Sequence, residues 1–120
     1  MNGKPILVLA EDEAMLRILA VEMLQDAGFQ VLEAMDGVQG LELLKAHPDV
    51  SLLVSDIKMP RMDGYALAQA GLELKPALKV LLMTGYAQEP PLALRGHVSL
   101  LQKPFNLEQL CALAVELTNA

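Results

Sequence analysis

The sequence predicts an α/β domain built on a parallel β-sheet. Short apolar runs alternate five times along the chain with longer stretches in which apolar residues recur at helical spacing. Alternation of this kind places consecutive strands parallel, with right-handed crossovers between them. Hydrophobic residues make up 53% of the 120 residues, which fits a sheet that helices cover on both faces. The length is that of one domain, so we expect a single domain over residues 1–120.

The first two strands and two helices have clear local signals. Gly28 stands where a glycine often ends a helix, because glycine readily adopts the left-handed backbone conformation found there. Pro48 ends the second helix, since the residue before a proline avoids the helical conformation. We expect these strands and helices in the order 5–10, about 14–27, 30–33 and up to 46.

The second half repeats the pattern with one weak point. Asn106 is a suitable N-cap for the last helix, and Gln109 occupies the capping-box position. Pro90, Pro91 and Gly96 interrupt the only stretch available for the helix before it, so we expect one or two turns there. The remaining elements are a strand that ends before Asp56, a helix over about 64–74, a strand that ends at Thr84 and a strand over 100–102.

Polar side chains follow four of the five predicted strands at the point where each strand ends. Glu11 and Asp12 follow the first strand, Asp56 the third, Thr84 the fourth and Lys103 the fifth. Ligands of open α/β sheets bind at the carboxyl ends of the strands, so these side chains should share one pocket. Three carboxylates, a hydroxyl and an ammonium group suit a hard divalent cation and a phosphoryl group.

The composition excludes several classes of protein. A net charge of −6 argues against direct binding of nucleic acid, because a phosphate backbone requires a basic surface. The single cysteine allows no internal disulfide and suits a reducing compartment. The chain has no signal-peptide pattern and no apolar run of about 18 residues. We therefore expect a cytoplasmic protein without membrane insertion.

Four motifs together resemble the signature of two-component receiver (response-regulator) domains, from about Ile6 to the last helix. They are Glu11-Asp12, the run Asp56-Ile57-Lys58-Met59-Pro60-Arg61-Met62-Asp63-Gly64, Thr84-Gly85-Tyr86-Ala87 and Lys103-Pro104-Phe105. The resemblance implies a flavodoxin-like (βα)5 three-layer sandwich with five parallel strands in the order 2-1-3-4-5. The last two motifs are most similar to those of receivers in hybrid histidine kinases, which leaves open whether the chain is one piece of a longer protein.

The resemblance also implies a reaction. Asp56 would accept a phosphoryl group from the phosphohistidine of a histidine kinase or a histidine phosphotransfer domain, and carboxylates are known to form such acyl phosphates. Mg²⁺ would be the cofactor, because Mg²⁺ binds through one or two carboxylates, several waters and phosphate oxygens. Its ligands would be Asp12, Asp56 and the backbone carbonyl of Lys58, with Glu11 holding a coordinated water.

The hydroxyl and the lysine would complete this site. A phosphoryl group in transfer spreads its charge over three oxygens, which require donors and cations already in place. Thr84 and Lys103 would supply a hydroxyl and an ammonium group to these oxygens. In the family the peptide bond between the lysine and its following proline, here Lys103-Pro104, is usually cis. Gly85 would leave the phosphoryl group open to a partner or to water.

Three further positions would tune the reaction or transmit its result. Lys58 and Tyr86 stand where the family modulates hydrolysis of the acyl phosphate, and Lys58 could either screen the phosphate or pair with a nearby carboxylate. Leu100 departs from the family pattern, in which an aromatic ring at this position turns inward after phosphorylation. The usual switch, and the usual dimer surface, are therefore in doubt, and we expect a monomer or a weak dimer.

The sequence favours a phosphoacceptor over two other kinds of protein. A Mg²⁺-dependent phosphohydrolase with an aspartyl nucleophile would carry a second acid two residues after it, where this chain has Lys58. A phosphate-independent interaction module would not need the acids, Thr84 and Lys103. A regulator that binds DNA would require an output domain outside these residues. The sequence does not identify the downstream partner.

Overall fold

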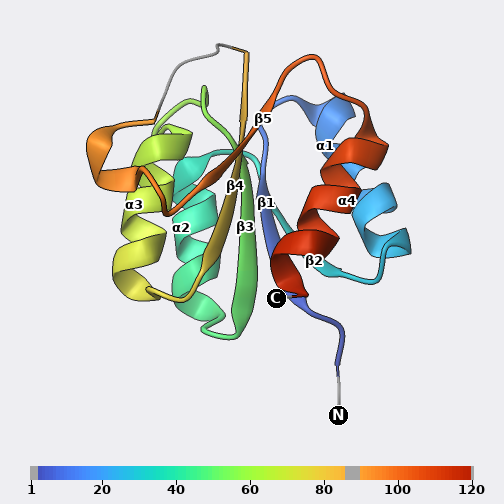
Figure 1. Ribbon diagram of the computed structural model, residues 1–120, viewed down its shortest axis with the longest axis horizontal. Coiled ribbons are helices and arrows are strands. Elements are labelled where there is room, and N and C mark those ends of the chain that lie inside the picture. Colours follow the sequence, from blue (N-terminus) through green and yellow to red (C-terminus); the bar gives the residue numbers. More distant parts are fainter. Residues whose placement is uncertain (1–2, 86–89, 120) are drawn as a thin grey trace.

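The protein is an α/β sandwich with a five-stranded parallel sheet at its centre. The computed structural model describes residues 3–85 and 90–119. The strands lie in the order β2-β1-β3-β4-β5, and every neighbouring pair is parallel. Their carboxyl ends are at the top of Figure 1. Their bounds are β1 Ile6–Ala10, β2 Gln30–Ala34, β3 Val50–Asp56, β4 Lys79–Thr84 and β5 Ser99–Gln102. The predicted sheet and strand order are confirmed.

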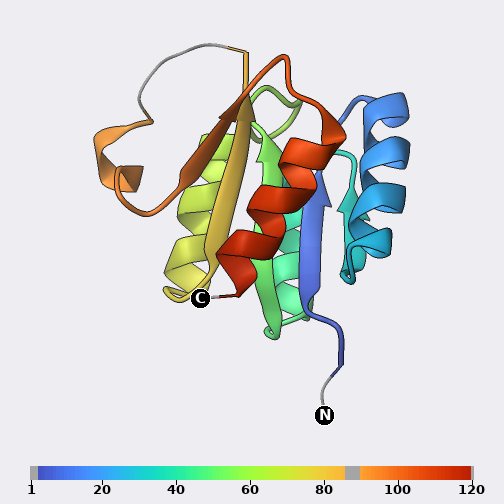
Figure 2. The same cartoon turned by 45° about the vertical axis from the view of Figure 1, so that its right-hand side comes forward.

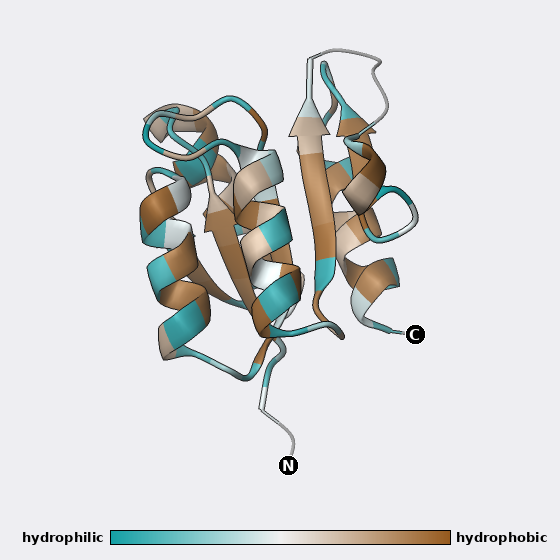
Figure 3. Ribbon diagram, turned by 90° about the vertical axis from the view of Figure 1, so that its left-hand side faces the viewer, coloured by the Kyte–Doolittle hydropathy of each residue, from teal (hydrophilic) through white to brown (hydrophobic). Residues whose placement is uncertain are grey.

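Two pairs of helices cover the two faces of the sheet. α1 (Ala14–Asp26) and α4 (Leu107–Thr118) lie on one face, and α2 (Gly37–Ala46) and α3 (Gly64–Leu74) lie on the other, as the two views in Figures 1 and 2 show. The central strands are apolar over most of their length, whereas the helices carry both apolar and hydrophilic residues (Figure 3). This distribution is typical of a sheet buried on both faces.

Alternate residues of the central strands fill two separate cores. Side chains of β1, β3 and β4 that point toward α1 and α4 include Leu7, Leu9, Leu52, Val54, Leu81 and Met83. Those that point toward α2 and α3 include Val8, Ala10, Leu53, Val80 and Leu82. All of them are almost fully buried. The sheet is therefore a rigid support for the loops at its carboxyl end.

The predicted helix boundaries agree closely with the structure. Gly28 has a φ of 105° directly after the C-cap of α1, which only glycine adopts without strain. The side chain of Asp36 caps α2 by accepting a hydrogen bond from Gln39 N. Asn106 and Gln109 form the predicted capping box at α4.

The segment before β5 holds one 3₁₀ turn, which agrees with the one or two turns that the sequence predicts. The described part of this segment contains only the turn η1 (Leu92–Leu94), so the described residues hold four α-helices. Leu94 is buried and anchors the turn against α3, whereas Leu92 is 77% exposed. Proline and glycine leave too few residues for a regular helix here. Over the described ranges, no helix is both long and apolar enough to cross a lipid bilayer.

Candidate functional site

Three carboxylates meet at the carboxyl end of the sheet. Glu11 and Asp12 follow β1, and Asp56 ends β3, which is hydrogen-bonded to β1 in parallel register. One oxygen from each carboxylate lies within 4.8 Å of the other two. Glu11 and Asp56 are buried, whereas Asp12 is exposed. The sheet therefore brings the three predicted acids together, and Asp12 faces the solvent from which an ion arrives.

Both oxygens of the Asp56 carboxylate have a partner. Oδ1 accepts a hydrogen bond from the backbone N–H of Ile57 at 2.8 Å, and Oδ2 lies 3.2 Å from Lys103 Nζ. Gly64 packs directly against the backbone here, because a methyl group in its place would overlap the carbonyl oxygen of Asp56. The loop after β3 therefore holds the Asp56 carboxylate in one orientation.

Glu11 is a buried acid with one free oxygen. Its Oε2 accepts a hydrogen bond from Glu13 N at 2.9 Å, whereas Oε1 has no hydrogen-bond partner among the described residues. The pKa of Glu11 is raised from 4.5 to about 7, chiefly by burial and also by the negative charge of Asp56, and the Glu13 N–H and the Lys103 ammonium oppose this rise. A buried, unpartnered carboxylate oxygen beside two other carboxylates is suited to a hard cation or to a water bound to one. The residues present therefore fit Mg²⁺.

A hollow of about 620 Å³ opens beside Asp56. Lys58, Thr84, Gly85 and Lys103 line it. The backbone N–H of Lys103 donates to the carbonyl oxygen of Thr84 at 2.6 Å, so the ends of β4 and β5 are joined across the hollow. The peptide bond between Lys103 and the following proline is cis, as the resemblance implies. The predicted hydroxyl and lysine thus lie at the same pocket as Asp56.

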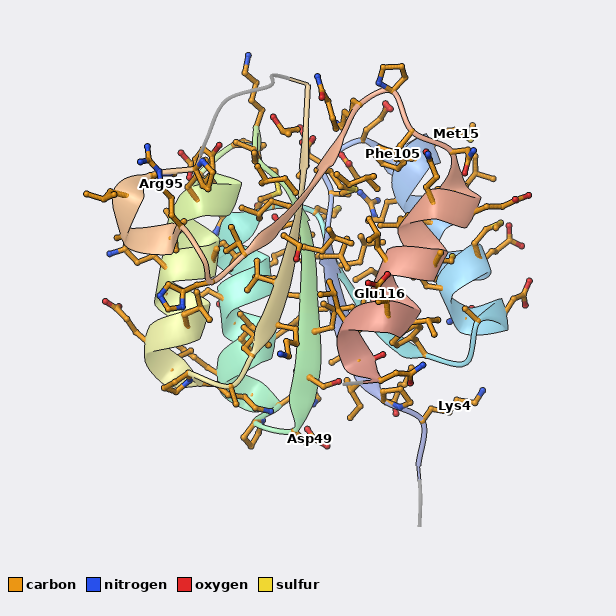
Figure 4. The ribbon with its side chains drawn as sticks, in the orientation of Figure 1. Lys4, Met15, Asp49, Arg95, Phe105 and Glu116 are labelled. Atoms are coloured by element: carbon orange, nitrogen blue, oxygen red, sulfur yellow. The ribbon has the colours of Figure 1, made fainter. Side chains whose placement is uncertain are left out.

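Phe105 and Met15 mark this end of the molecule in Figure 4, and Asp49 marks the opposite end.

Two predicted positions are not part of the described pocket. Leu100 lies on the edge strand β5, is 37% exposed and does not line the hollow beside Asp56. Tyr86 lies outside the described residues.

Two residues near the site belong to no sequence motif, so the sequence analysis did not identify them. The side chain of Arg17 on α1 donates from Nη1 to the carbonyl oxygen of Glu11 at 2.8 Å and lies 3.3 Å from Glu33 Oε1 on β2. Tyr65, at the start of α3, lines the hollow beside Asp56. The only sequence signals are their positions, in the first turn of the helix that follows Asp12 for Arg17 and directly after Gly64 for Tyr65.

The chain is similar in sequence to several known proteins. The chain is 34% identical to the sensor kinase CckA of Brucella abortus (strain 2308), in an alignment 121 positions long that covers 98% of this chain but 13% of that protein. It is 37% identical to the response regulator receiver protein CpdR of the same organism, over 87% of this chain and 88% of CpdR. It spans 54% of the transcriptional regulatory protein PdtaR of Mycobacterium tuberculosis, at 35% identity. The fraction of each relative's own length that this chain covers thus differs widely among the three proteins.

Solved structures agree with these relatives. The receiver domain of the hybrid histidine kinase CckA superposes with a TM-score of 0.81 at 27% identity, over 93% of this chain and 97% of that one. A response regulator receiver protein from Sinorhizobium medicae WSM419 gives a TM-score of 0.84 at 28% identity, over 98% and 96% of the two chains.

The family match extends over residues 7–115, described as the response regulator receiver domain. Members of this family accept a phosphoryl group in two-component signalling and pair with histidine kinases or phosphotransfer proteins. This membership does not favour a phosphohydrolase or a phosphate-independent interaction module. The chain therefore belongs to the response regulator receiver domains.

Proposed function

We propose that Asp56 is the phosphoacceptor of this receiver domain and that its donor is the phosphohistidine of a histidine kinase or a histidine phosphotransfer domain. The observation that carries this proposal is the setting of the Asp56 carboxylate. One of its oxygens accepts from Ile57 N–H and the other faces Lys103, at the side of a hollow with room for a phosphoryl group. A carboxylate held in this way is oriented before the donor arrives, which lowers the entropic cost of transfer.

The transfer is an in-line displacement at phosphorus. One carboxylate oxygen of Asp56 forms the new O–P bond as the P–N bond to the donor imidazole breaks, and the imidazole leaves with the electron pair of that bond. The Lys103 ammonium then stabilises negative charge on the phosphoryl oxygens, and the Thr84 hydroxyl donates to one of them. The product is an acyl phosphate on Asp56.

Mg²⁺ is the proposed cofactor of this step. Asp12, Asp56 and the backbone carbonyl of Lys58 would hold it, and Glu11 would hold a water in its coordination shell. The free, buried Oε1 of Glu11 and the close approach of the three carboxylates support this assignment. When bound, the ion offsets the repulsion among the acids and neutralises charge on the phosphoryl group.

The lifetime of the acyl phosphate depends on access to the hollow. Gly85 is exposed, and a methyl group added to it would meet no atom of residues 3–85 or 90–119 within 4 Å, which favours approach of water and a partner from this side. Lys58 also lines the hollow. We propose that these two residues, with Tyr86, set the rate of hydrolysis. The domain thus assists its own phosphorylation and dephosphorylation rather than acting as an enzyme on other substrates.

The wider setting of the domain is also a proposal. A single cysteine and an acidic surface favour a cytoplasmic domain that does not contact nucleic acid by itself. With Leu100 in place of an aromatic ring and η1 in place of a helix, the common dimer surface is altered, so we propose a monomer or a weak dimer. Residues 1–120 would form one receiver domain, either alone or as part of a hybrid kinase or a larger regulator.

Acetyl phosphate with Mg²⁺ tests the proposal directly. It should modify the protein once, and intact-mass analysis should find no modification in Asp56→Asn, which keeps the shape of the side chain but removes the nucleophile. Asp49→Asn is the matched control, because Asp49 is an exposed acid at the opposite end of the molecule (Figure 4). Modification that persists in Asp56→Asn would contradict the assignment. Turnover of small phosphoesters would instead support the phosphohydrolase.

A further inference from the structure

The loop between β3 and α3 is seated on the start of α2. This loop, residues 57–63, follows Asp56 directly. Arg61 Nη1 lies 3.3 Å from Asp36 Oδ2, at the N-cap of α2. Next to this ion pair, Gly37 packs so closely on the loop that a methyl group in its place would overlap the carbonyl oxygen of Met62. Two independent contacts therefore join the loop to α2.

Arg61 adopts a backbone conformation that its side chain disfavours. Its φ is 71°, and it is the one non-glycine residue with positive φ in ranges 3–85 and 90–119. The N–H of Met62 donates to the carbonyl oxygen of Pro60 at 2.8 Å, which closes a three-residue γ-turn around Arg61. A γ-turn with positive φ is rare and strained, and glycine would adopt it more readily. The side chain of Arg61 must therefore contribute an interaction that offsets the strain.

That interaction is with the second oxygen of a buried acid. The Asp36 side chain is only 9% exposed, and its Oδ1 is already occupied by the hydrogen bond from Gln39 N. Arg61 provides the charged partner of Oδ2 from a side chain that is 58% exposed. Without Arg61 that oxygen would lose its partner in a largely buried place, which is unfavourable.

The same loop carries the backbone groups that face the acidic pocket. Its first residue, Ile57, orients the Asp56 carboxylate through its N–H. The next residue is Lys58, whose carbonyl oxygen is a proposed ligand of Mg²⁺. The loop also lines a hollow of about 550 Å³ together with Asp12. A shift of the γ-turn would therefore move the backbone on which the metal site depends.

We propose that Arg61 is a positioning residue for this site: its ion pair with Asp36 holds the β3–α3 loop in the strained turn and so fixes the carbonyl of Lys58 for Mg²⁺. This inference rests on the proposed function, because it takes the metal site as given. It assigns Arg61 no contact with the phosphoryl group.

Three variants test the ion pair separately from the backbone. Arg61→Gly removes the side chain but adopts the turn without strain, and Asp36→Asn keeps an N-cap acceptor for Gln39 N but removes the charge. Arg61→Lys keeps the positive charge and serves as the rescue variant. Asp12→Ala, which removes a proposed ligand, reports on the metal site itself.

The readouts are the Mg²⁺ dissociation constant from calorimetry with the metal alone, the midpoint of thermal unfolding in EDTA, and amide hydrogen exchange in residues 57–63. Arg61→Gly should weaken Mg²⁺ binding about two- to fivefold, the range that a partly exposed ion pair supports. Exchange in the loop should become faster. The unfolding midpoint should change little, since relief of strain offsets the lost ion pair. Arg61→Lys should recover part of the affinity.

Asp36→Asn should weaken Mg²⁺ binding by a similar factor. The double variant with Arg61→Gly should bind Mg²⁺ no more weakly than either single variant, because both substitutions remove the same ion pair. Unchanged Mg²⁺ affinity in Arg61→Gly, or full additivity in the double variant, would overturn the inference. If Asp12→Ala abolishes binding at the same time, the proposed metal site stands without a role for Arg61. If Asp12→Ala binds Mg²⁺ as well as the wild type, the metal site itself is wrong.

Discussion

Replacement of Glu11 by glutamine should stabilise the metal-free protein, and the gain should grow with pH. Burial raises the pKa of Glu11 to about 7, above its ordinary value of 4.5, so the folded state binds this proton more tightly than the unfolded chain does. The stability that the protonated group contributes is complete below the unfolded pKa and is lost as the pH rises through about 7. At about 1.4 kcal/mol per pK unit, the loss approaches about 3 kcal/mol in alkaline solution. Glutamine does not ionise, so the variant avoids that loss.

Urea denaturation in EDTA, repeated between about pH 5 and pH 9, measures this difference. The two proteins should be similar in stability at the acidic end, because glutamine keeps an oxygen for the N–H of Glu13. Above neutral pH the variant should be more stable. Mg²⁺ at about a hundred times its dissociation constant should stabilise the wild type by about 2.7 kcal/mol. This stabilisation should reduce the difference in stability between the variant and the wild type. A stability difference that is constant over this pH range would refute the reasoning.

Three further predictions concern the same end of the molecule. Asp12→Ala should raise the Mg²⁺ dissociation constant about tenfold or more, and unchanged binding in calorimetry would mean that the acids only begin a helix. Gly64→Ala should destabilise the protein by about 1–3 kcal/mol in urea, because its methyl group would overlap the carbonyl oxygen of Asp56. Gly85→Ala, which has open space, is the control, and equal losses in both would contradict the prediction. Beryllofluoride with Mg²⁺ should slow amide exchange most in residues 90–98, whereas changes confined to the sheet would exclude that segment from the switch.

The strands and helices were predictable because local patterns and tertiary burial agree. Each central strand is apolar on both faces, and the structure buries both faces. The apolar pattern and the burial therefore favour the same secondary structure for these segments. Boundaries differ by a residue or two, as at Pro5, which precedes β1, and Ala34, which extends β2. The shortened fourth helix was signalled by its prolines, but sequence could not place Leu94 as its buried anchor, since that depends on α3.

The candidate site divides in a similar way. The meeting of the acids with Thr84 and Lys103 follows from where the strands end, and the structure brings them together. Their chemical roles stay predictions. The free oxygen of Glu11 and the ion pair between Arg61 and Asp36 had no sequence signal, because both depend on loop conformations that no periodic pattern records.

The route by which phosphorylation reaches the surface follows from two observations on β4 and β5. Leu100 is a partly exposed aliphatic residue, so no ring is present there to turn inward. The carbonyl oxygen of Thr84 accepts the N–H of Lys103, so a movement of Thr84 toward a phosphoryl group also pulls on the end of β5. Beyond Gly85, residues 90–98 return to β5 with Leu94 as their one fully buried apolar residue. We therefore expect the signal to pass through the backbone of Thr84 and Lys103 into this weakly anchored segment, where a small displacement needs little energy.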